Sequence, residues 1–185
     1  MEMDKKAFSE MVDKTIYSVS NDETRYHLNG VYFGKTDESA DSTLRMVATD
    51  GHRLSLIDSA AENLSNFKSK GVIIPRKGLN EIRKILDSID GKFEMAIEGA
   101  QLIVRHENTL LMVRLIEGKY PNYQQLIPQN LKHQLLLKRE SFVSSLKRVS
   151  LLSNQKSKGV TFNLKSGFIE ISSNNPELGD AKEEL

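Results

Sequence analysis

The stretch Met46-Val47-Ala48-Thr49-Asp50-Gly51-His52-Arg53-Leu54-Ser55-Leu56 places a polar segment between two apolar runs. Apolar residues alternate with others on both sides of this segment, a period typical of strands with one buried face. Asp-Gly favours a turn, because glycine adopts positive φ without strain and aspartate tolerates it. The stretch therefore predicts two strands joined by a tight connection that projects His52 and Arg53. Both an ordinary hairpin tip and a functional loop fit this pattern.

The composition limits the classes of function that the chain can serve. Its 185 residues include 26 Lys and Arg against 25 Asp and Glu, so the net charge of +1 excludes a uniformly basic nucleic-acid coat. The absence of cysteine excludes disulfides, thiolate catalysis and Cys-based zinc sites, and favours a reducing compartment. The apolar runs are too short for a membrane span, and the first residues do not resemble a signal peptide. We expect a soluble, cytoplasmic protein without membrane contact.

Hydrophobic periodicity predicts a helix followed by strands, a pattern that recurs along the chain. The first cycle has a helix over 5–19, capped by Asp4, and strands over 25–33, 43–49 and 53–57. The second has a strand over 72–74, a helix over 77–88 and strands over 92–97, 101–106 and 110–116. A third opens at 134–137, with a helix over 139–152 and strands over 160–164 and 168–172, whereas 177–185 is acidic and shows no strand pattern. This order predicts an α+β protein.

The recurrence predicts two domains of unequal completeness. When Phe142 is laid over Phe8, the third helix aligns with the first, and its predicted buried stripe is Phe142, Leu146 and Val149. Residues 1–127 then form one domain of two units, and residues 128–185 form the first part of a homologous domain that lacks its second half. The turn-prone residues 118–123 suit a crossing between domains. We expect the incomplete domain to be partly uncovered and weakly stable.

No catalytic or metal-binding motif stands out. The chain lacks the phosphate-loop, dinucleotide-binding, nucleophile-elbow and zinc-protease patterns, and its four histidines, at 27, 52, 106 and 133, are widely separated. We therefore predict no enzyme, no cofactor and no metal. Two alternatives remain: a small intracellular hydrolase or transferase that uses Asp50 and His52 as an acid–base pair, and a purely structural repeat module.

Charges are segregated along the chain. Cations gather on the predicted helices, at Arg76, Lys77, Arg83, Lys84, Lys138, Arg139, Lys147 and Arg148. Carboxylates gather in a hairpin and at the C-terminal end, at Asp37, Glu38, Asp41, Glu177, Asp180, Glu183 and Glu184. Such helices either solvate an outer face or bind phosphates, and phosphate binding of this kind is independent of base sequence.

Several motifs, in their order and spacing, resemble the bacterial DNA polymerase III beta subunit family, the replication sliding clamp. They are Arg25-Tyr26-His27-Leu28-Asn29-Gly30, Ala48-Thr49-Asp50-Gly51-His52-Arg53-Leu54, Pro75-Arg76-Lys77, Gly118-Lys119-Tyr120-Pro121-Asn122-Tyr123 and Leu152-Ser153-Asn154. The resemblance covers essentially the whole chain, as the middle domain and the start of the third. It implies the DNA-clamp fold, in which repeated helix-plus-antiparallel-strand units place helices on one face and sheets on the other.

The resemblance also implies a function without catalysis. Full-length chains would form a homodimeric ring that encircles double-stranded DNA, whereas this fragment alone is not expected to close a ring. Residues implied to face DNA are Arg25, Tyr26, His27, Arg76 and Lys77. A pocket would bind short peptides of the DNA polymerase III alpha subunit, the clamp loader and repair polymerases. Its implied walls are Leu28, Thr49, Gly51, His52, Arg53, Leu54, Pro121 and Leu126, while Gln125 and Ser157 depart from the family pattern.

Overall fold

The computed structural model describes residues 1–36, 43–61, 64, 67, 71–154 and 156–185. The chain divides into two compact units, Met1–Gln124 (unit 1) and Gln125–Leu185 (unit 2). The acidic residues Asp37, Glu38 and Asp41 lie outside the described residues. None of the described helices is long and apolar enough to cross a membrane.

Unit 1 consists of two successive strand-helix-three-strand repeats. The first repeat contains β1 (Glu2–Asp4), α1 (Lys5–Asp13), β2 (Gly30–Lys35), β3 (Leu44–Thr49) and β4 (Leu54–Ser59). The second contains β5 (Val72–Pro75), α2 (Arg76–Asp87), β6 (Lys92–Glu98), β7 (Gln101–His106) and β8 (Thr109–Arg114). The predicted α+β class and the repeated helix-plus-strand order are confirmed.

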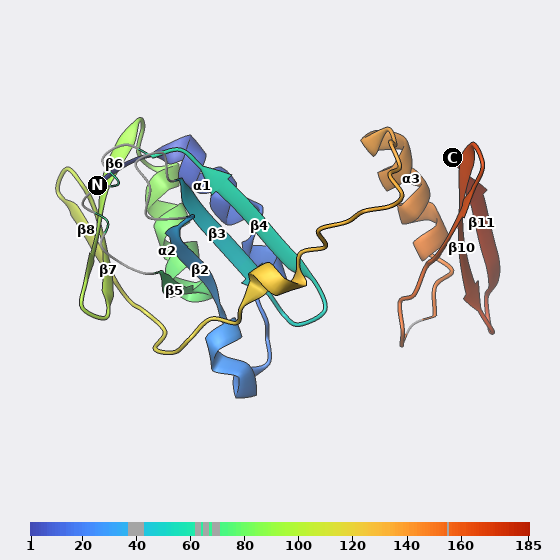
Figure 1. Cartoon of the computed structure of the whole chain (residues 1–185), viewed down its shortest axis with the longest axis horizontal. Coiled ribbons are helices and arrows are strands. Elements are labelled where there is room, and N and C mark those ends of the chain that lie inside the picture. Colours follow the sequence, from blue (N-terminus) through green and yellow to red (C-terminus); the bar gives the residue numbers. More distant parts are fainter. Residues whose placement is uncertain (37–42, 62–63, 65–66, 68–70, 155) are drawn as a thin grey trace. The chain divides into compact units, whose positions relative to one another are not determined.

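The two repeats interlock through their first strands. The strands form two antiparallel sheets, in the orders β1-β6-β7-β8 and β4-β3-β2-β5 (Figure 1). Strand β1 of the first repeat therefore pairs with β6 of the second, and β5 of the second pairs with β2 of the first. Helices α1 and α2 lie against each other, and Nη2 of Arg83 is 2.8 Å from Oδ1 of Asp13. The two helices of unit 1 thus share one layer.

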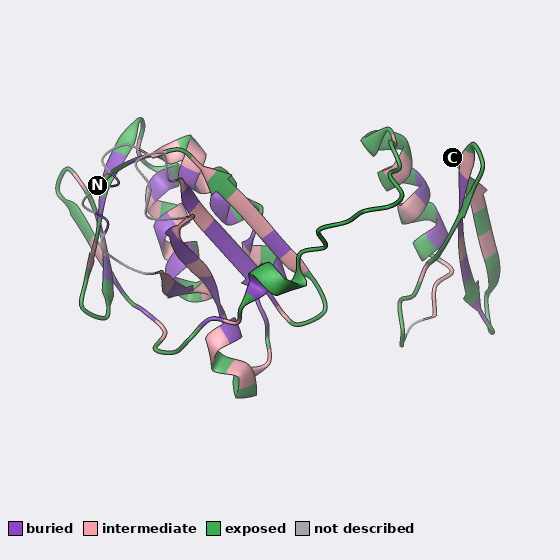
Figure 2. Ribbon diagram, in the orientation of Figure 1, coloured by how far each residue is buried: buried purple, intermediate pink, exposed green. Residues whose placement is uncertain are grey.

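A single apolar core joins both helices to the inner faces of both sheets. It includes Phe8 of α1, Leu79 and Ile82 of α2, Met46 of β3 and Leu102 of β7, all fully buried. Figure 2 shows the buried residues concentrated on the helices and central strands of unit 1. Burial of this many apolar side chains is the dominant favourable contribution to folding.

The prediction that the strand around Met46 has one buried face is wrong, because β3 is buried on both faces. Val47 points away from the main core, yet it is fully buried in a second cluster with Leu28, Ile73, Tyr120 and Tyr123. The segment after β8 folds back over this face, and the N–H of Ile116 donates to the carbonyl of Ile73 at 2.9 Å.

The segment between α1 and β2 also differs from its prediction. Helix α1 ends at Asp13, followed by a 3₁₀ helix at Ile16–Ser18, so the predicted helix does not continue to residue 19. Residues 25–28, predicted as strand, lie in a second 3₁₀ helix, Glu23–Leu28. The side chain of Asp22 begins this helix by accepting the N–H of Thr24 at 3.0 Å. Local capping therefore overrides the alternating pattern.

Unit 2 contains one helix and a three-stranded antiparallel sheet. Its elements are α3 (Arg139–Ser150), β9 (Thr161–Lys165), β10 (Phe168–Asn175) and β11 (Gly179–Glu184), with sheet order β11-β10-β9. Residues 134–137 form no strand. Val149 is buried, but Phe142 and Leu146 of the predicted stripe are only half-buried. The ring of Phe142 stacks on Phe162 of β9, a strand that is exposed along its whole length.

The prediction of no strand near the C-terminal end is wrong. Strand β11 pairs with β10 over six residues, from Glu170↔Glu184 to Asn175↔Gly179. Its side chains pair by charge instead of by apolar packing: Nζ of Lys182 lies 2.6 Å from Glu170, and Nε of Arg148 lies 2.6 Å from Glu183. A search for alternating apolar residues does not detect such a strand.

Candidate functional site

The β3–β4 hairpin tip is held by hydrogen bonds at every residue of its turn. Gly51 has φ +90°, which its lack of a side chain allows. The carboxylate Oδ1 of Asp50 accepts the backbone N–H groups of His52 and Arg53, each at 3.0 Å. Oγ1 of Thr49 donates to the carbonyl of Arg53 at 2.7 Å and accepts the N–H of Gly51 at 3.1 Å. The tip is therefore rigid and exposed.

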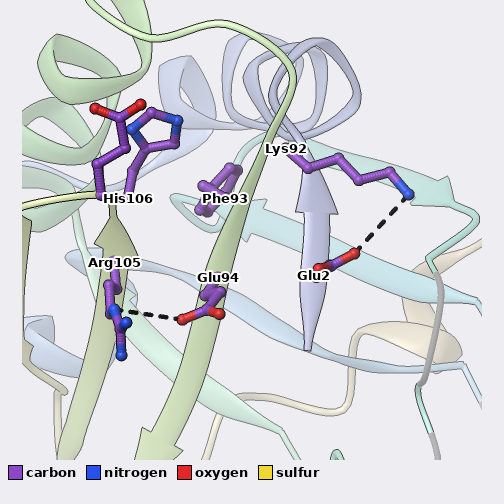
Figure 3. Close-up of a pocket in the computed structure, with 7 residues that line it drawn as sticks. Glu2, Lys92, Phe93, Glu94, Arg105 and His106 are labelled. Carbon is purple, nitrogen blue, oxygen red and sulfur yellow. Dashed lines mark ion pairs between the residues drawn. The ribbon is translucent and has the colours of Figure 1, made fainter.

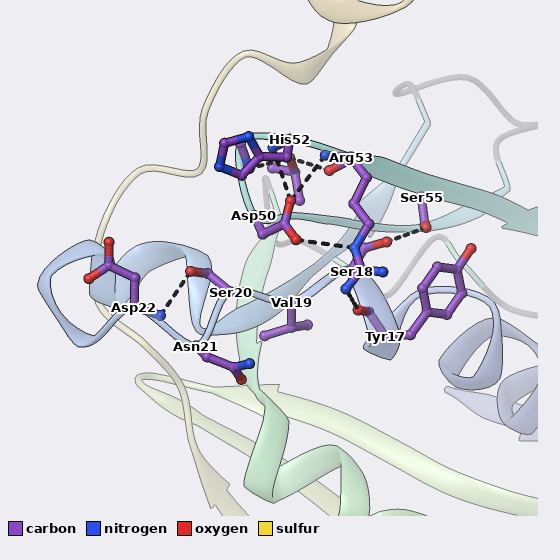
Figure 4. A network of polar contacts seen from close by, with 12 residues as sticks. Tyr17, Ser18, Val19, Ser20, Asn21, Asp22, Asp50, His52, Arg53 and Ser55 are labelled. Atoms are coloured by element: carbon purple, nitrogen blue, oxygen red, sulfur yellow. Dashed lines mark hydrogen bonds and ion pairs between the residues drawn. The ribbon is translucent and has the colours of Figure 1, made fainter. Parts of the chain in front are cut away.

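Arg53 fastens this tip to the segment that follows α1 (Figure 4). Its Nη2 donates to the carbonyl of Tyr17 at 2.6 Å, its Nε lies 3.1 Å from Oδ2 of Asp50, and its Cζ lies 5.7 Å from the centre of the Tyr17 ring. Nearby, the buried hydroxyls of Ser18 and Ser55 are 2.6 Å apart. The hairpin and the α1 end thus form one structural group.

The residues predicted to line a peptide pocket differ in how far they are buried. Leu28 and Thr49 are buried, Leu54 and Pro121 are half-buried, and Gly51, His52 and Arg53 are exposed. Leu54 packs against the second apolar cluster of unit 1, so the protein itself covers part of its surface. Leu126 falls in unit 2, is 62% exposed, and is not among the residues that unit 1 brings together.

Three of the predicted DNA-facing residues are consecutive in the 3₁₀ helix Glu23–Leu28, and one of them, Arg25, reaches the hairpin tip. Tyr26 is 57% exposed, and its ring contacts His27 edge-on at 5.6 Å between ring centres. Arg25 donates through Nε to Asp22 at 2.9 Å. A Cβ atom added to Gly51 would lie 2.9 Å from Nη1 of Arg25, so the two predicted sets of residues meet here.

Arg76 and Lys77, in the first turn of α2, have different surroundings. The guanidinium of Arg76 donates to the carbonyl of Val19 and to Oδ1 of Asn21, while its Nε is buried without a partner among the described residues. Lys77 is exposed, and no hydrogen bond or ion pair joins its side chain to any described residue. Arg76 therefore supports the local structure, and Lys77 is available to a ligand.

Two family models match the chain in succession. Residues 2–122 match the DNA polymerase III beta subunit, central domain, and residues 124–185 match the DNA polymerase III beta subunit, C-terminal domain. The chain belongs to the DNA polymerase III beta subunit family. The beta sliding clamps of Vibrio cholerae and Caulobacter vibrioides are 34% and 33% identical to it over 175 residues. These alignments cover 95% of this chain but 46% and 47% of the relatives, so the chain spans about half their length.

Solved sliding clamps share the fold of this beta-subunit chain. The Bartonella birtlesii clamp, whose structure was determined with griselimycin bound, aligns with a TM-score of 0.92 at 33% identity. The C. crescentus beta sliding clamp aligns with a TM-score of 0.93 at 32% identity. Both alignments cover all of this chain and 50% of the solved chain, which confirms the predicted clamp fold.

The proposed acid–base pair of the hydrolase alternative is not supported in this beta-subunit chain. The Asp50 carboxylate contacts the backbone N–H of His52, and that bond, followed by the N–H of Arg53, lowers the pKa of Asp50 to about 2. A carboxylate with so low a pKa is a poor general base at neutral pH. Among the described residues, no group of His, Asp and Glu could hold a metal ion.

Several of the helix cations are already paired. On α2, Arg83 pairs with Asp13, and Lys84 lies 2.9 Å from Glu81. On α3, Arg148 forms two hydrogen bonds with Glu183, at 2.6 and 2.7 Å. The predicted separation of basic helices from acidic strand ends is therefore weaker than the sequence indicates.

A shallow hollow runs along α2, lined by Arg76, Lys77, Asn80, Glu81, Arg83, Lys84 and Asp87.

A second polar hollow lies over β6 and β7, away from every predicted site residue (Figure 3). It is lined by Glu2, Lys92, Phe93, Glu94, Arg105, His106 and Glu107. Nε of Arg105 is 3.6 Å from Oε2 of Glu94, and Nζ of Lys92 is 4.0 Å from Oε2 of Glu2. Its charges largely compensate one another, so we assign it no ligand.

Proposed function

We propose that this chain is the middle domain and the opening of the third domain of a sliding clamp, a non-enzymatic processivity factor of DNA replication in the cytoplasm. The full-length protein would be a homodimeric ring around double-stranded DNA. Family membership and the shared clamp fold support this function over the hydrolase or transferase. A ring holds DNA by topology, so its contacts need not read bases.

The α1–α2 layer and the 3₁₀ helix Glu23–Leu28 are the proposed DNA-facing surface. Lys77 is exposed without a described partner, Arg25 reaches the hairpin tip at Gly51, and Tyr26 and His27 follow it in the same 3₁₀ helix. Cations that contact phosphates release counterions, so the interaction should weaken steeply with salt. We assign Arg76 the supporting role of holding the start of α2 against Val19 and Asn21.

The β3–β4 hairpin is the proposed anchor for short peptides of the polymerase III alpha subunit, the clamp loader and repair polymerases. The observation that carries this proposal is a rigid, exposed tip placed beside half-buried Leu54 and Pro121. Such a tip combines an apolar edge with polar His52 and Arg53, and this combination suits an anchoring Leu or Phe side chain.

Calorimetry with a peptide of the QL clamp-binding type tests the proposal. The wild-type chain should bind the peptide, and Gly51→Trp, whose side chain would extend over the tip, should abolish binding. The same peptide with its anchoring Leu replaced by Ala is the matched control ligand and should not bind. The peptide should also raise the melting temperature, whereas a phosphorylated metabolite or a divalent metal should not. Unchanged affinity in Gly51→Trp would remove the site assignment.

A further inference from the structure

We infer that Tyr120 is a positioning residue for the peptide site, because its hydroxyl holds the main chain of Thr49 and thereby fixes the hairpin tip beside Pro121. The inference rests on the proposed peptide-binding function and adds a residue outside its walls. Sequence reasoning missed this role, since the two residues lie 71 positions apart and no local pattern relates them.

The hydroxyl replaces a missing strand partner. Strand β2 pairs with β3 from Lys35↔Leu44 to Tyr32↔Val47, so Thr49 extends beyond the paired part of β3 on that side. The N–H of Thr49 instead donates to Oη of Tyr120 at 3.1 Å, at a residue only 4% exposed. A buried backbone N–H without an acceptor is strongly unfavourable, so removal of the hydroxyl should shift this part of the strand.

The contact is transmitted to the tip through the Thr49 side chain. Its Oγ1 donates to the carbonyl of Arg53 and accepts the N–H of Gly51. Thr49 therefore receives support from Tyr120 through its main chain and gives support to the turn through its hydroxyl. Because Pro121 follows Tyr120 directly, the same tyrosine relates two proposed walls of the site.

The surroundings of Tyr120 fix its ring and keep its hydroxyl neutral. The residue is 8% exposed, and its ring lies 5.6 Å from the ring of Tyr32 between centres. Burial raises the pKa of Tyr120 to about 12, so the hydroxyl stays protonated throughout the physiological range. Tyr120→Phe would keep the packed ring and remove only the acceptor.

The apolar cluster offers a matched control in Tyr123. This residue is also 8% exposed and lies 5.7 Å from the Tyr32 ring, but its hydroxyl interacts with the side chain of Arg45 on β3 and not with the main chain of the hairpin tip. Tyr123→Phe therefore removes a buried hydroxyl from the same cluster without touching Thr49. A purely structural role of Tyr120 predicts the same outcome for both substitutions.

The experiment compares wild type, Tyr120→Phe and Tyr123→Phe in the 185-residue chain. Affinity for a fluorescein-labelled QL-type peptide is measured by anisotropy, and exchange of the Thr49 amide proton is measured by NMR. Tyr120→Phe should lower the affinity for the peptide about fivefold, which is the effect of one net hydrogen bond. It should also accelerate exchange of the Thr49 amide proton. Tyr123→Phe should leave the Thr49 exchange rate unchanged and the affinity within about twofold.

Three results would overturn the inference: Tyr120→Phe that binds the peptide as wild type does, Thr49 exchange that does not change, or equal weakening in both variants. Failure of the proposed function is distinguishable from these results, because it appears as absence of peptide binding by the wild-type chain itself. In that case the inference falls with it.

Discussion

Nη1 of Arg25 lies 2.9 Å from the point where Gly51 would carry a Cβ atom. Arg25 belongs to the proposed DNA-facing surface, and Gly51 belongs to the proposed peptide site. Gly51 also has φ +90°, a conformation that costs other residues free energy. The turn therefore requires glycine at this position, whereas the guanidinium of Arg25 can move aside.

Gly51→Ala should lower the free energy of unfolding of unit 1 by about 1–2 kcal/mol, because alanine disfavours positive φ. The close contact with Arg25 should add little, since the end of a flexible side chain can move. Urea unfolding measures the loss. Gly91→Ala is the matched control, because Gly91 has φ +76° and an added Cβ would meet nothing within 4 Å. Full retention of stability in Gly51→Ala would contradict the role of positive φ.

Lys77→Ala and Arg76→Ala should have opposite profiles. Lys77→Ala should weaken binding of duplex DNA without loss of stability. It should also reduce the slope of log affinity against log salt concentration by about one, which corresponds to the release of one counterion fewer. Arg76→Ala should instead lower the free energy of unfolding by about 1–3 kcal/mol, because the carbonyl of Val19 loses its donor. Fluorescence anisotropy across a salt series and urea unfolding separate the two effects.

The control for both variants is Arg114→Ala, because Arg114 is an exposed cation on β8, outside the α1–α2 layer. This substitution should change neither DNA affinity nor stability. If Arg114→Ala weakened DNA binding as much as Lys77→Ala does, the helix layer would not be the DNA-facing surface.

The helices and strands that the sequence predicts well are those in which the spacing of apolar residues coincides with the face that is buried. In the stripe that the spacing of α2 indicates, Leu79, Ile82 and Leu86 are fully buried and Ile85 is half-buried. Strand β11 was not predicted, because it is held in place by backbone pairing and by charged contacts such as that of Lys182 with Glu170. These contacts leave no apolar period in the sequence.

The candidate site was predictable only in its local part. Asp50-Gly51 indicates a turn, and the structure has one there. The groups that hold the turn in place are distant in sequence: Tyr17 lies 36 positions from Arg53, and Tyr120 lies 71 positions from Thr49. Contacts of this kind depend on how the repeats interlock, which residue spacing alone does not specify.

Arg53→Lys should weaken peptide binding severalfold although it conserves charge. Lysine cannot reproduce the planar arrangement in which the guanidinium reaches Asp50 and the carbonyl of Tyr17 together while it stacks on the Tyr17 ring. Peptide titration measures the loss. Arg105→Lys, in the polar hollow over β7, is the matched substitution and should leave the affinity unchanged. Equal affinity in wild type and Arg53→Lys would show that charge alone suffices.

Unit 2 should lose stability in acid. The pKa of Glu170 is lowered to about 2 by hydrogen bonds from Lys165, then Lys182 and Asn163, and the pKa of Glu183 is lowered to about 2, chiefly by Arg148. Because both values lie below the ordinary 4.5, folding favours the ionised forms. Their contribution is complete above about pH 4.5 and is lost as the pH falls toward about 2.

Hydrogen exchange of β10 and β11 amides, measured by mass spectrometry after incubation at pH 6 and at pH 3, checks this dependence. The opening free energy, corrected for the intrinsic exchange rate, should fall between these pH values in wild type. It should fall less in a Glu170→Gln, Glu183→Gln double variant, whose amides cannot titrate. Glu177→Gln is the control, because this exposed carboxylate lies outside both networks, and its variant should keep the wild-type dependence. A double variant with an unchanged acid dependence would show that other groups govern the transition.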